Sequence, residues 1–369
     1  MKTLYYHQPH TLLNRALRLL QTIIQRKGIL SLFTTLTILL LPLSVQGQTS
    51  NKILINSGWE MQDAAIISKE GMKAGWEMEN AAKVPQEGKV ISTTKYKPSG
   101  WYKATVPGTV LTTLVNNGVY PEPLYGENNR PEVIPEYLCH TDWWYRNEVM
   151  IPDSYKNKTI WLNFDGINYS ADIWVNGHRV GPIKGAFIRG NFDITSFVKP
   201  GQTAIIAVRI SPQPNTGVPF EHIMGTVGGP CGGVGRLDGP TFGCSNGWDW
   251  LSGIRDRNSG IWQDVFLSAT GHVLMKDPLI TSDLPLPRTD IASVTVQTTV
   301  QNTTGNVQKG IIKGSFDSIK FEKTIEIAPW RSLTFTFDPK DFAQLNIKNP
   351  KLWWPNGLGE QNLYSMHLS

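Results

Sequence analysis

A run of short β-forming segments separated by turn dipeptides, residues 163–210, constrains the fold of this chain more than any other feature. The dipeptides are Asp165-Gly166, Asn176-Gly177 and Pro200-Gly201, and the segments between them are rich in β-branched and aromatic residues. Asn-Gly is the strongest short hairpin signal, because a two-residue type I′ turn needs positive φ at both positions. Two packed antiparallel sheets are the natural way to bury such short strands, so the run predicts a β-sandwich.

The rest of the chain continues this pattern, and helical periodicity is scarce. Strands are predicted at 143–151, 160–164, 171–175, 203–210 and 261–270, with strand beginnings at 57–61 and 75–78 and a short helix at 111–117. A second set of evenly spaced alternating segments at 293–301, 307–316, 321–327 and 332–337 predicts an immunoglobulin-like sandwich. The predicted fold class is therefore all-β.

The first 47 residues are predicted to be a secretory leader outside the fold. Arg26 and Lys27 precede the uncharged run 28–43, and Val45 and Gly47 supply small residues for cleavage before Gln48. The alternative is a retained membrane anchor, since the uncharged run is near the lower length limit for a span. Cleavage would leave no stable membrane anchor and place the mature chain in the periplasm or outside the cell.

The net charge of +5 is confined to this leader. Lys and Arg number 35 and Asp and Glu 30 in the whole chain, and residues 1–47 hold five basic residues and no acidic one. The remainder is therefore neutral, which gives no electrostatic case for nucleic acid as a partner. Its length is sufficient for two domains with their own cores.

Three cysteines lie at positions 139, 231 and 244. Export permits disulfides, and Cys231 and Cys244 flank a glycine-rich loop that has little means of ordering itself. We expect these two to pair, which leaves Cys139 as a free buried thiol. Spacing alone does not choose among the three possible pairings.

Several motifs, in this order, resemble one enzyme family. The run 106–110 (VPGTV) precedes 123–129 (PLYGENN), and 352–357 (LWWPNG) precedes 363–368 (LYSMHL). Together with 163–210 they resemble the N-terminal region of the family 2 glycoside hydrolases, in the exo-β-glucosaminidase and β-mannosidase branch. After the predicted signal peptide at 1–47, the resemblance implies a jelly-roll (galactose-binding-like) β-sandwich at 48–271 and an incomplete, truncated immunoglobulin-like sandwich at 272–369.

The sharpest candidate for chemistry is the run 247–250, which contains Trp248, Asp249 and Trp250. Sugars stack their C–H faces on aromatic rings and hydrogen-bond to carboxylates, and function usually lies in irregular chain of this kind. The resemblance implies that Asp249 contacts sugar hydroxyls while Trp248 or Trp250 shapes the pocket wall. In the alternative, both tryptophans are core residues and Asp249 caps a turn. The nearby run 256–258 is interpreted as a structural ion-paired loop, and Trp262 as a core residue.

No catalytic residue, metal site or cofactor is predicted. Retaining glycosidases need two carboxylates about 5 Å apart, and in this family an Asn-Glu dipeptide carries the acid/base. Asn147-Glu148 matches that dipeptide but falls inside a predicted strand with no evident second glutamate, so we interpret it as a coincidence. The glycine-rich run 228–235 lacks the strand and helix of a nucleotide loop, and the histidines are scattered. Acidic residues at turns or strand edges are interpreted as structural: Asp165, Asp172 and Asp193.

Two functions follow from these observations. In the first, the chain is the N-terminal non-catalytic region of a secreted retaining exo-β-glycosidase, which acts on a β-linked carbohydrate in polysaccharide breakdown. The catalytic barrel of such an enzyme takes about 250 residues, for which the chain has no room, so no hydrolysis by this chain alone is expected. In the second, the chain is a stand-alone carbohydrate-binding protein without hydrolase activity. An unfinished final sheet argues against the second.

Overall fold

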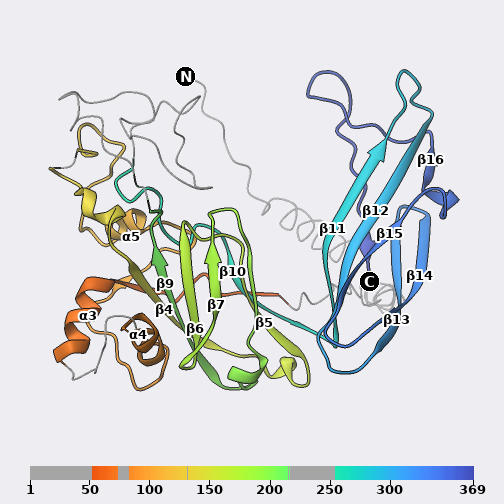
Figure 1. The fold of residues 1–369 in the computed structure, drawn as a ribbon. Coiled ribbons are helices and arrows are strands. Elements are labelled where there is room, and N and C mark those ends of the chain that lie inside the picture. The colour runs from red at the N-terminus through yellow and green to blue at the C-terminus, as the bar shows by residue number, and fades with distance from the viewer. Residues whose placement is uncertain (1–51, 74–82, 131, 215, 217–253) are drawn as a thin grey trace, which may run out of the picture. The chain divides into compact units, whose positions relative to one another are not determined.

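The computed structural model describes residues 52–73, 83–130, 132–214, 216 and 254–369, and they form two β-sandwiches (Figure 1). The all-β prediction is therefore confirmed. The predicted strand beginning at 75–78 lies outside the described residues.

The first sandwich contains two antiparallel sheets. The larger has the order β3-β2-β4-β9-β6-β7, and the smaller has the order β1-β10-β5-β8. The strands of the larger sheet are β2 Glu60–Asp63, β3 Tyr102–Lys103, β4 Trp143–Met150, β6 Ser170–Val175, β7 His178–Lys184 and β9 Thr203–Ser211. Those of the smaller sheet are β1 Ile53–Leu54, β5 Thr159–Phe164, β8 Gly190–Asp193 and β10 Val265–Thr270.

The core of the first sandwich follows from the two-residue periodicity of its strands. Trp143 and Tyr145 on β4 belong to the main hydrophobic core, with Leu162 of β5 and Leu267 of β10 in the same cluster. Trp144, between them, belongs instead to a second cluster on the other face of the large sheet. Both faces of this sheet are therefore buried.

The hairpin between β6 and β7 forms as predicted. Asn176 and Gly177 have φ values of 48° and 85°, which a type I′ turn requires. The Asn176 side chain also donates to the Phe197 carbonyl at 2.7 Å and accepts from the Ile205 amide at 2.8 Å. The asparagine thus fixes the turn against its neighbours.

Two helices that the sequence pattern did not predict, α3 Ala64–Lys73 and α4 Lys83–Ile91, cover the outer face of the large sheet (Figure 1). Ile67 and Ile91 pack there in one cluster with Trp144 and Trp174. A β-carbon on Gly88 of α4 would lie 2.2 Å from the Trp174 ring, so only glycine permits this approach.

A third helix, α5 Val110–Asn116, agrees with the predicted helix at 111–117, and the Thr109 side chain caps its first turn. Short 3-10 helices complete the inventory of described helices: η2 Glu136–Cys139, η3 Asp153–Tyr155, η4 Thr195–Phe197 and η6 Ala343–Leu345.

The last strand of the first sandwich begins later than predicted. The pattern predicts a strand from residue 261, but β10 begins at Val265. The Ile261 carbonyl accepts a hydrogen bond from the Gly108 amide at 2.8 Å. Residues near 260 are therefore bonded to the chain before α5 and to Asn168, beyond the end of strand β5.

The second sandwich also has two antiparallel sheets. One contains β11 Val273–Asp283, β12 Ile291–Asn302, β15 Ser332–Phe337 and β16 Asn346–Lys348, and the other contains β13 Gln308–Phe316, β14 Ile319–Ile327 and β17 His367–Leu368. Strand β12 alternates in burial along its whole length, and Phe316, Phe321 and Phe337 share the core. The four predicted strands of this sandwich agree with β12 to β15 within two residues at each end.

Candidate functional site

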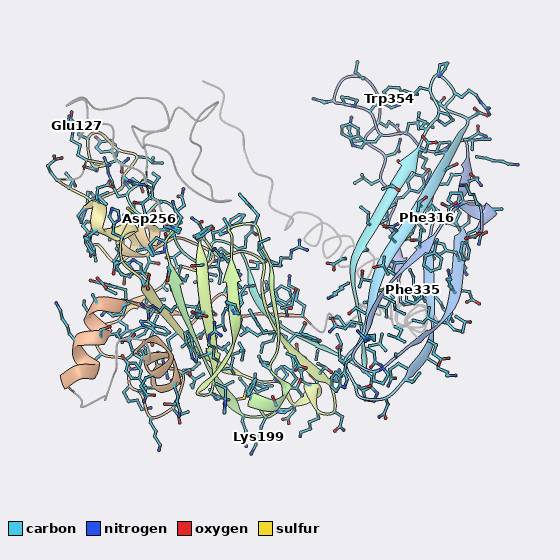
Figure 2. All side chains as sticks on the ribbon, viewed as in Figure 1. Glu127, Lys199, Asp256, Phe316, Phe335 and Trp354 are labelled. Atoms are coloured by element: carbon cyan, nitrogen blue, oxygen red, sulfur yellow. The ribbon has the colours of Figure 1, made fainter. Side chains whose placement is uncertain are left out.

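The residues predicted to bind sugar, Trp248, Asp249 and Trp250, lie outside the described residues, as do Cys231 and Cys244. The two described residues that flank this segment are Thr216 and Ile254. The described part of the candidate site therefore consists of Thr216, Ile254 and the residues that bind them. Figure 2 shows Asp256, just beyond the second flank, at the same end of the first sandwich as Glu127 and at the opposite end from Lys199.

One arginine binds both flanks of the segment 217–253. The Arg257 Nε donates to the Thr216 carbonyl at 2.7 Å, and Nη1 of the same guanidinium donates to the Ile254 carbonyl at 2.9 Å. The Arg257 side chain is only 2% exposed. Because a guanidinium is planar and presents its donors in a fixed fork, these bonds set the separation of the two flanks.

Glu136 forms ion pairs with this arginine and with a second one. Its two carboxylate oxygens accept from Arg255 and from Arg257, each at 2.7 Å. Arg255 is 1% exposed at its side chain and also donates to the Asn129 carbonyl. Buried charges are tolerated when they are paired and fully hydrogen-bonded, as here. The ion-paired structural loop predicted at 256–258 is therefore present, with the 3-10 helix η2 supplying its acid.

Asp256 caps helix α5 from a distant part of the sequence. Its Oδ2 accepts from the Leu111 amide at 2.6 Å, in the first turn of α5, and its Oδ1 accepts from the Asn258 amide at 2.8 Å. Burial raises the pKa of this carboxyl, while these hydrogen bonds and the charge of Arg257 oppose the rise. The buried carboxylate is stabilised by orphan amides and by the positive end of the helix dipole.

The backbone around these side chains is strained and held by side-chain hydrogen bonds. Arg257 and Asn258 have φ values of 51° and 56°, a region that non-glycine residues rarely occupy. The Asn168 side chain donates to both of their carbonyl oxygens, at 2.9 and 3.0 Å. Strain of this kind persists only when its surroundings determine it, and it is concentrated at functional sites.

Glu136, Cys139 and His140 place three potential ligand atoms within 4.8 Å of one another. Both oxygens of Glu136 are already bonded to guanidinium groups. Cys139 is a buried free thiol whose pKa is raised by burial, whereas a metal binds the thiolate. The electrostatics of this group therefore disfavour a cation.

Sequence reasoning missed three members of the network: Glu136, Arg255 and Asn168. Glu136 lies 121 residues before Arg257 in the chain, and no local pattern links them. Trp262 was predicted as a core residue, which is wrong. It is half-buried, donates to the Ala186 carbonyl at 2.9 Å and packs edge-on against Phe187. Its indole N–H needs a partner, and the turn after β7 supplies one.

Comparison with known proteins identifies the family. Residues 76–263 match the family model described as glycosyl hydrolase 2 galactose-binding domain-like, and residues 273–369 match the model of glycosyl hydrolases family 2. The chain belongs to glycoside hydrolase family 2. The first sandwich is accordingly its jelly roll, and the second its immunoglobulin-like domain.

Three relatives show which family 2 proteins the chain resembles. It is 31% identical over 283 residues to an exo-beta-D-glucosaminidase of Streptomyces avermitilis, covering 76% of this chain and 28% of that protein. It is 33% identical over 304 residues to a mannosylglycoprotein endo-beta-mannosidase of Lilium longiflorum, covering 75% of this chain and 30% of that protein. The exo-chitosanase CsxA of Amycolatopsis orientalis superposes with a TM-score of 0.63 at 26% identity, over 85% of this chain and 31% of that one. The chain thus spans less than a third of each relative.

The dipeptide Asn147-Glu148 lies on strand β4 of the family 2 jelly roll, as predicted. Glu148 accepts from Arg146 at 2.8 Å, and Asn147 donates to the Ser57 carbonyl at 2.9 Å. A second glutamate, Glu60, lies 3.9 Å from the same guanidinium. Since the arginine is shared by both carboxylates, the group is a cross-strand ion cluster that joins β2 to β4.

The three acidic residues interpreted as structural have structural contacts. Asp165 lies near Lys52 and Arg189, and Asp172 pairs with Arg179 across the β6–β7 hairpin. Asp193 accepts from the backbone amide of Thr195 at 2.9 Å, at the start of η4.

Proposed function

We propose that this chain is the N-terminal, non-catalytic region of a secreted retaining exo-β-glycosidase of the exo-β-D-glucosaminidase or β-mannosidase type. Membership of family 2 and the named activities of its relatives support the reaction class. The carboxylates of Glu60 and Glu148 share one buried arginine, which supports a structural role for both. A retaining mechanism instead requires one carboxylate free to attack and one acid free to give its proton.

The proposal includes export of the chain from the cytoplasm. Residues 1–47 act as a signal peptide, the jelly-roll domain extends over 48–271 and the immunoglobulin-like domain over 272–369. The protein then works in the periplasm or outside the cell without a stable membrane anchor. Within the described part of the chain, none of the helices is long and apolar enough to cross a membrane.

The substrate contacts are assigned to Asp249, with Trp248 and Trp250 as walls of the sugar site. The observation that carries this assignment is the binding of both flanks of segment 217–253 by one buried guanidinium. A buried ion network is an unusual support for an ordinary surface loop, because a well-packed apolar cluster gives equal stability. It does fix the positions of Thr216 and Ile254, the residues that flank the proposed binding segment. A disulfide between Cys231 and Cys244 would restrain the same segment.

Sugar binding by the full chain tests the contact residues. We expect Asp249→Asn to weaken binding of β-1,4-linked glucosamine or mannose oligosaccharides about tenfold, the loss of a charge-assisted hydrogen bond to a hydroxyl. Asp283→Asn on the exposed end of β11 changes the charge equally and serves as the control. Equal affinities for the two variants, measured by calorimetry, would remove Asp249 from the site.

Hydrolysis tests the non-catalytic assignment and separates it from a complete enzyme. We expect no turnover of aryl β-glucosaminide or aryl β-mannoside by the purified chain. Turnover that disappears in Glu148→Gln would overturn the assignment. Binding of oligosaccharides without turnover is also the property of a stand-alone carbohydrate-binding protein, and the intact mass of the native polypeptide distinguishes that protein from a region of a longer enzyme.

A further inference from the structure

A cavity of 230 Å³ lies beside helix α5, next to the second flank of segment 217–253. Residues from three separate stretches line it: Thr112 and Asn116 of α5, Glu122 and Leu124 of the following turn, and Ile254 and Asn258 of the ion-paired loop. The volume is below the roughly 300–1,000 Å³ of pockets for drug-sized ligands. It therefore suits a single ring rather than an extended molecule.

The lining combines the two kinds of contact that a sugar ring uses. Leu124 and Ile254 offer apolar surface for its C–H groups, while Asn116 and Asn258 carry amides that both donate and accept. Polar groups placed around an apolar cavity are the ordinary composition of a small-molecule site.

Hydrogen bonds hold several residues of the cavity lining in place. Asn258 is held at positive φ by the Asp256 and Asn168 side chains, and the Ile254 carbonyl is bound by Arg257. In the turn after α5, Glu122 Oε1 accepts from the Leu124 amide at 3.2 Å, and the Glu122 carbonyl accepts from the Asn128 side chain at 3.0 Å. Such preorganisation lowers the entropy lost on binding.

The charge of the cavity lining indicates which class of sugar the cavity would bind. Glu122 is the only ionisable side chain in the lining of this cavity, as the described residues define it. A lone carboxylate attracts a cationic ligand and forms a charge-assisted hydrogen bond with an ammonium group. Among sugars, a 2-amino-2-deoxy unit carries such a group, whereas mannose and N-acetylated units are neutral.

We propose that this cavity is a binding subsite for a protonated amino-sugar unit, with Glu122 as the residue that selects the amine. This inference rests on the proposed function and extends it from β-linked glycosides in general to glucosamine-containing chains. Leu124 and Ile254 then contact the ring, and Asn116 and Asn258 bond to its hydroxyls.

Calorimetric titration of the full chain with a β-1,4-linked glucosamine trimer, below the pKa of its amines, tests the proposal. We expect Glu122→Gln to weaken binding of this trimer about three- to tenfold, the range for a partly exposed charge pair. Binding of a β-1,4-mannose trimer should be unchanged. The matched control is Glu127→Gln in the same turn, because Glu127 pairs with Arg130 and does not line the cavity.

The outcomes separate this subsite from the proposed function. Equal effects of Glu122→Gln and Glu127→Gln would overturn the subsite, as would equal weakening for the glucosamine and mannose trimers. If either result overturns the subsite but Asp249→Asn still weakens binding, the proposed function stands without the subsite. Failure of the wild-type chain to bind the glucosamine trimer would also overturn the subsite, and mannose binding would then show whether the proposed function survives.

Discussion

The two sandwiches share an all-β architecture, but among the described residues the buried ion pairs lie in the first sandwich, alongside exposed ones. In the jelly roll, Glu136, Arg255 and Arg257 form ion pairs at side chains that are 16% exposed or less. In the described part of the immunoglobulin-like domain, the ion pairs join side chains that are 46–73% exposed. Exposed pairs contribute little to stability, and buried pairs contribute mainly when their removal would leave a charge alone. The difference indicates that the jelly roll uses charge to fix a geometry, while the second domain depends on apolar packing.

The largest expected effect follows from removing the centre of the buried network. Arg257→Ala leaves Glu136 with one partner and frees both flanks of segment 217–253, so we expect a loss of about 3–5 kcal/mol in the unfolding free energy of the jelly roll. Native-state hydrogen exchange, followed separately in peptides of β4 and β12, measures the two domains in one experiment.

The control for this variant is Arg179→Ala, which removes an arginine that is half exposed on the β6–β7 hairpin. We expect a cost under about 1 kcal/mol there. A comparable loss of protection in β12 and β4 for Arg257→Ala would contradict the assignment of the network to the jelly roll alone.

In the second domain, added side-chain volume rather than the loss of a charge is expected to reduce stability. A β-carbon on Gly314 of β13 would lie 2.1 Å from the Phe321 ring, so Gly314→Ala should cost about 1–3 kcal/mol by overpacking. Gly310→Ala in the same strand has nothing within 4 Å of the added carbon and should change stability by less than about 0.5 kcal/mol. Thermal or denaturant unfolding of both variants checks this, and similar costs at both positions would show that packing is not the cause.

A smaller effect is expected at the cap of α5. Thr109→Ala removes the bond to the Thr112 amide and should destabilise the jelly roll by about 0.5–2 kcal/mol. Thr109→Ser keeps the hydroxyl and should retain most of that stability. If the two variants lose the same amount, the methyl group of Thr109 rather than its hydrogen bond is responsible.

The smallest expected effect is a pH dependence of the folding stability that comes from the titration of Asp256. Because burial raises the pKa of this carboxyl above its ordinary value of 3.8, the folded chain holds the proton more tightly than the unfolded chain. The stability from this group is therefore fully present below pH 3.8 and is lost as pH rises through the raised folded pKa. Asp256→Asn lacks this titration. We expect the stability of the wild type relative to this variant to fall as pH rises from 3.8, measured by hydrogen exchange in α5. Parallel pH dependences of stability in the wild type and in Asp256→Asn would contradict this prediction.

Local sequence signals predicted most of the strands and few of the contacts at the site. The Asn176-Gly177 turn and the alternation along β12 are read from adjacent residues, and both were predicted correctly. Helix α4 was missed because it contains Pro85 and Gly88, which propensity assigns to turns. Gly88 is explained only by the Trp174 ring that lies against it. The pairing of Glu136 with Arg257 depends on the folded topology, so no short-range pattern reveals it. The roles of Asp249 and its neighbouring tryptophans stay predictions.

The binding of both flanks by Arg257 has a consequence for how this domain can diversify. The Thr216 and Ile254 carbonyls are bonded to one guanidinium, so the two residues that flank the segment are held together by the scaffold. Doubling the length of a closed loop costs only about 0.6 kcal/mol in chain entropy. We therefore expect the jelly roll to tolerate changes in the length of segment 217–253 as long as Arg257 holds the two flanking residues together.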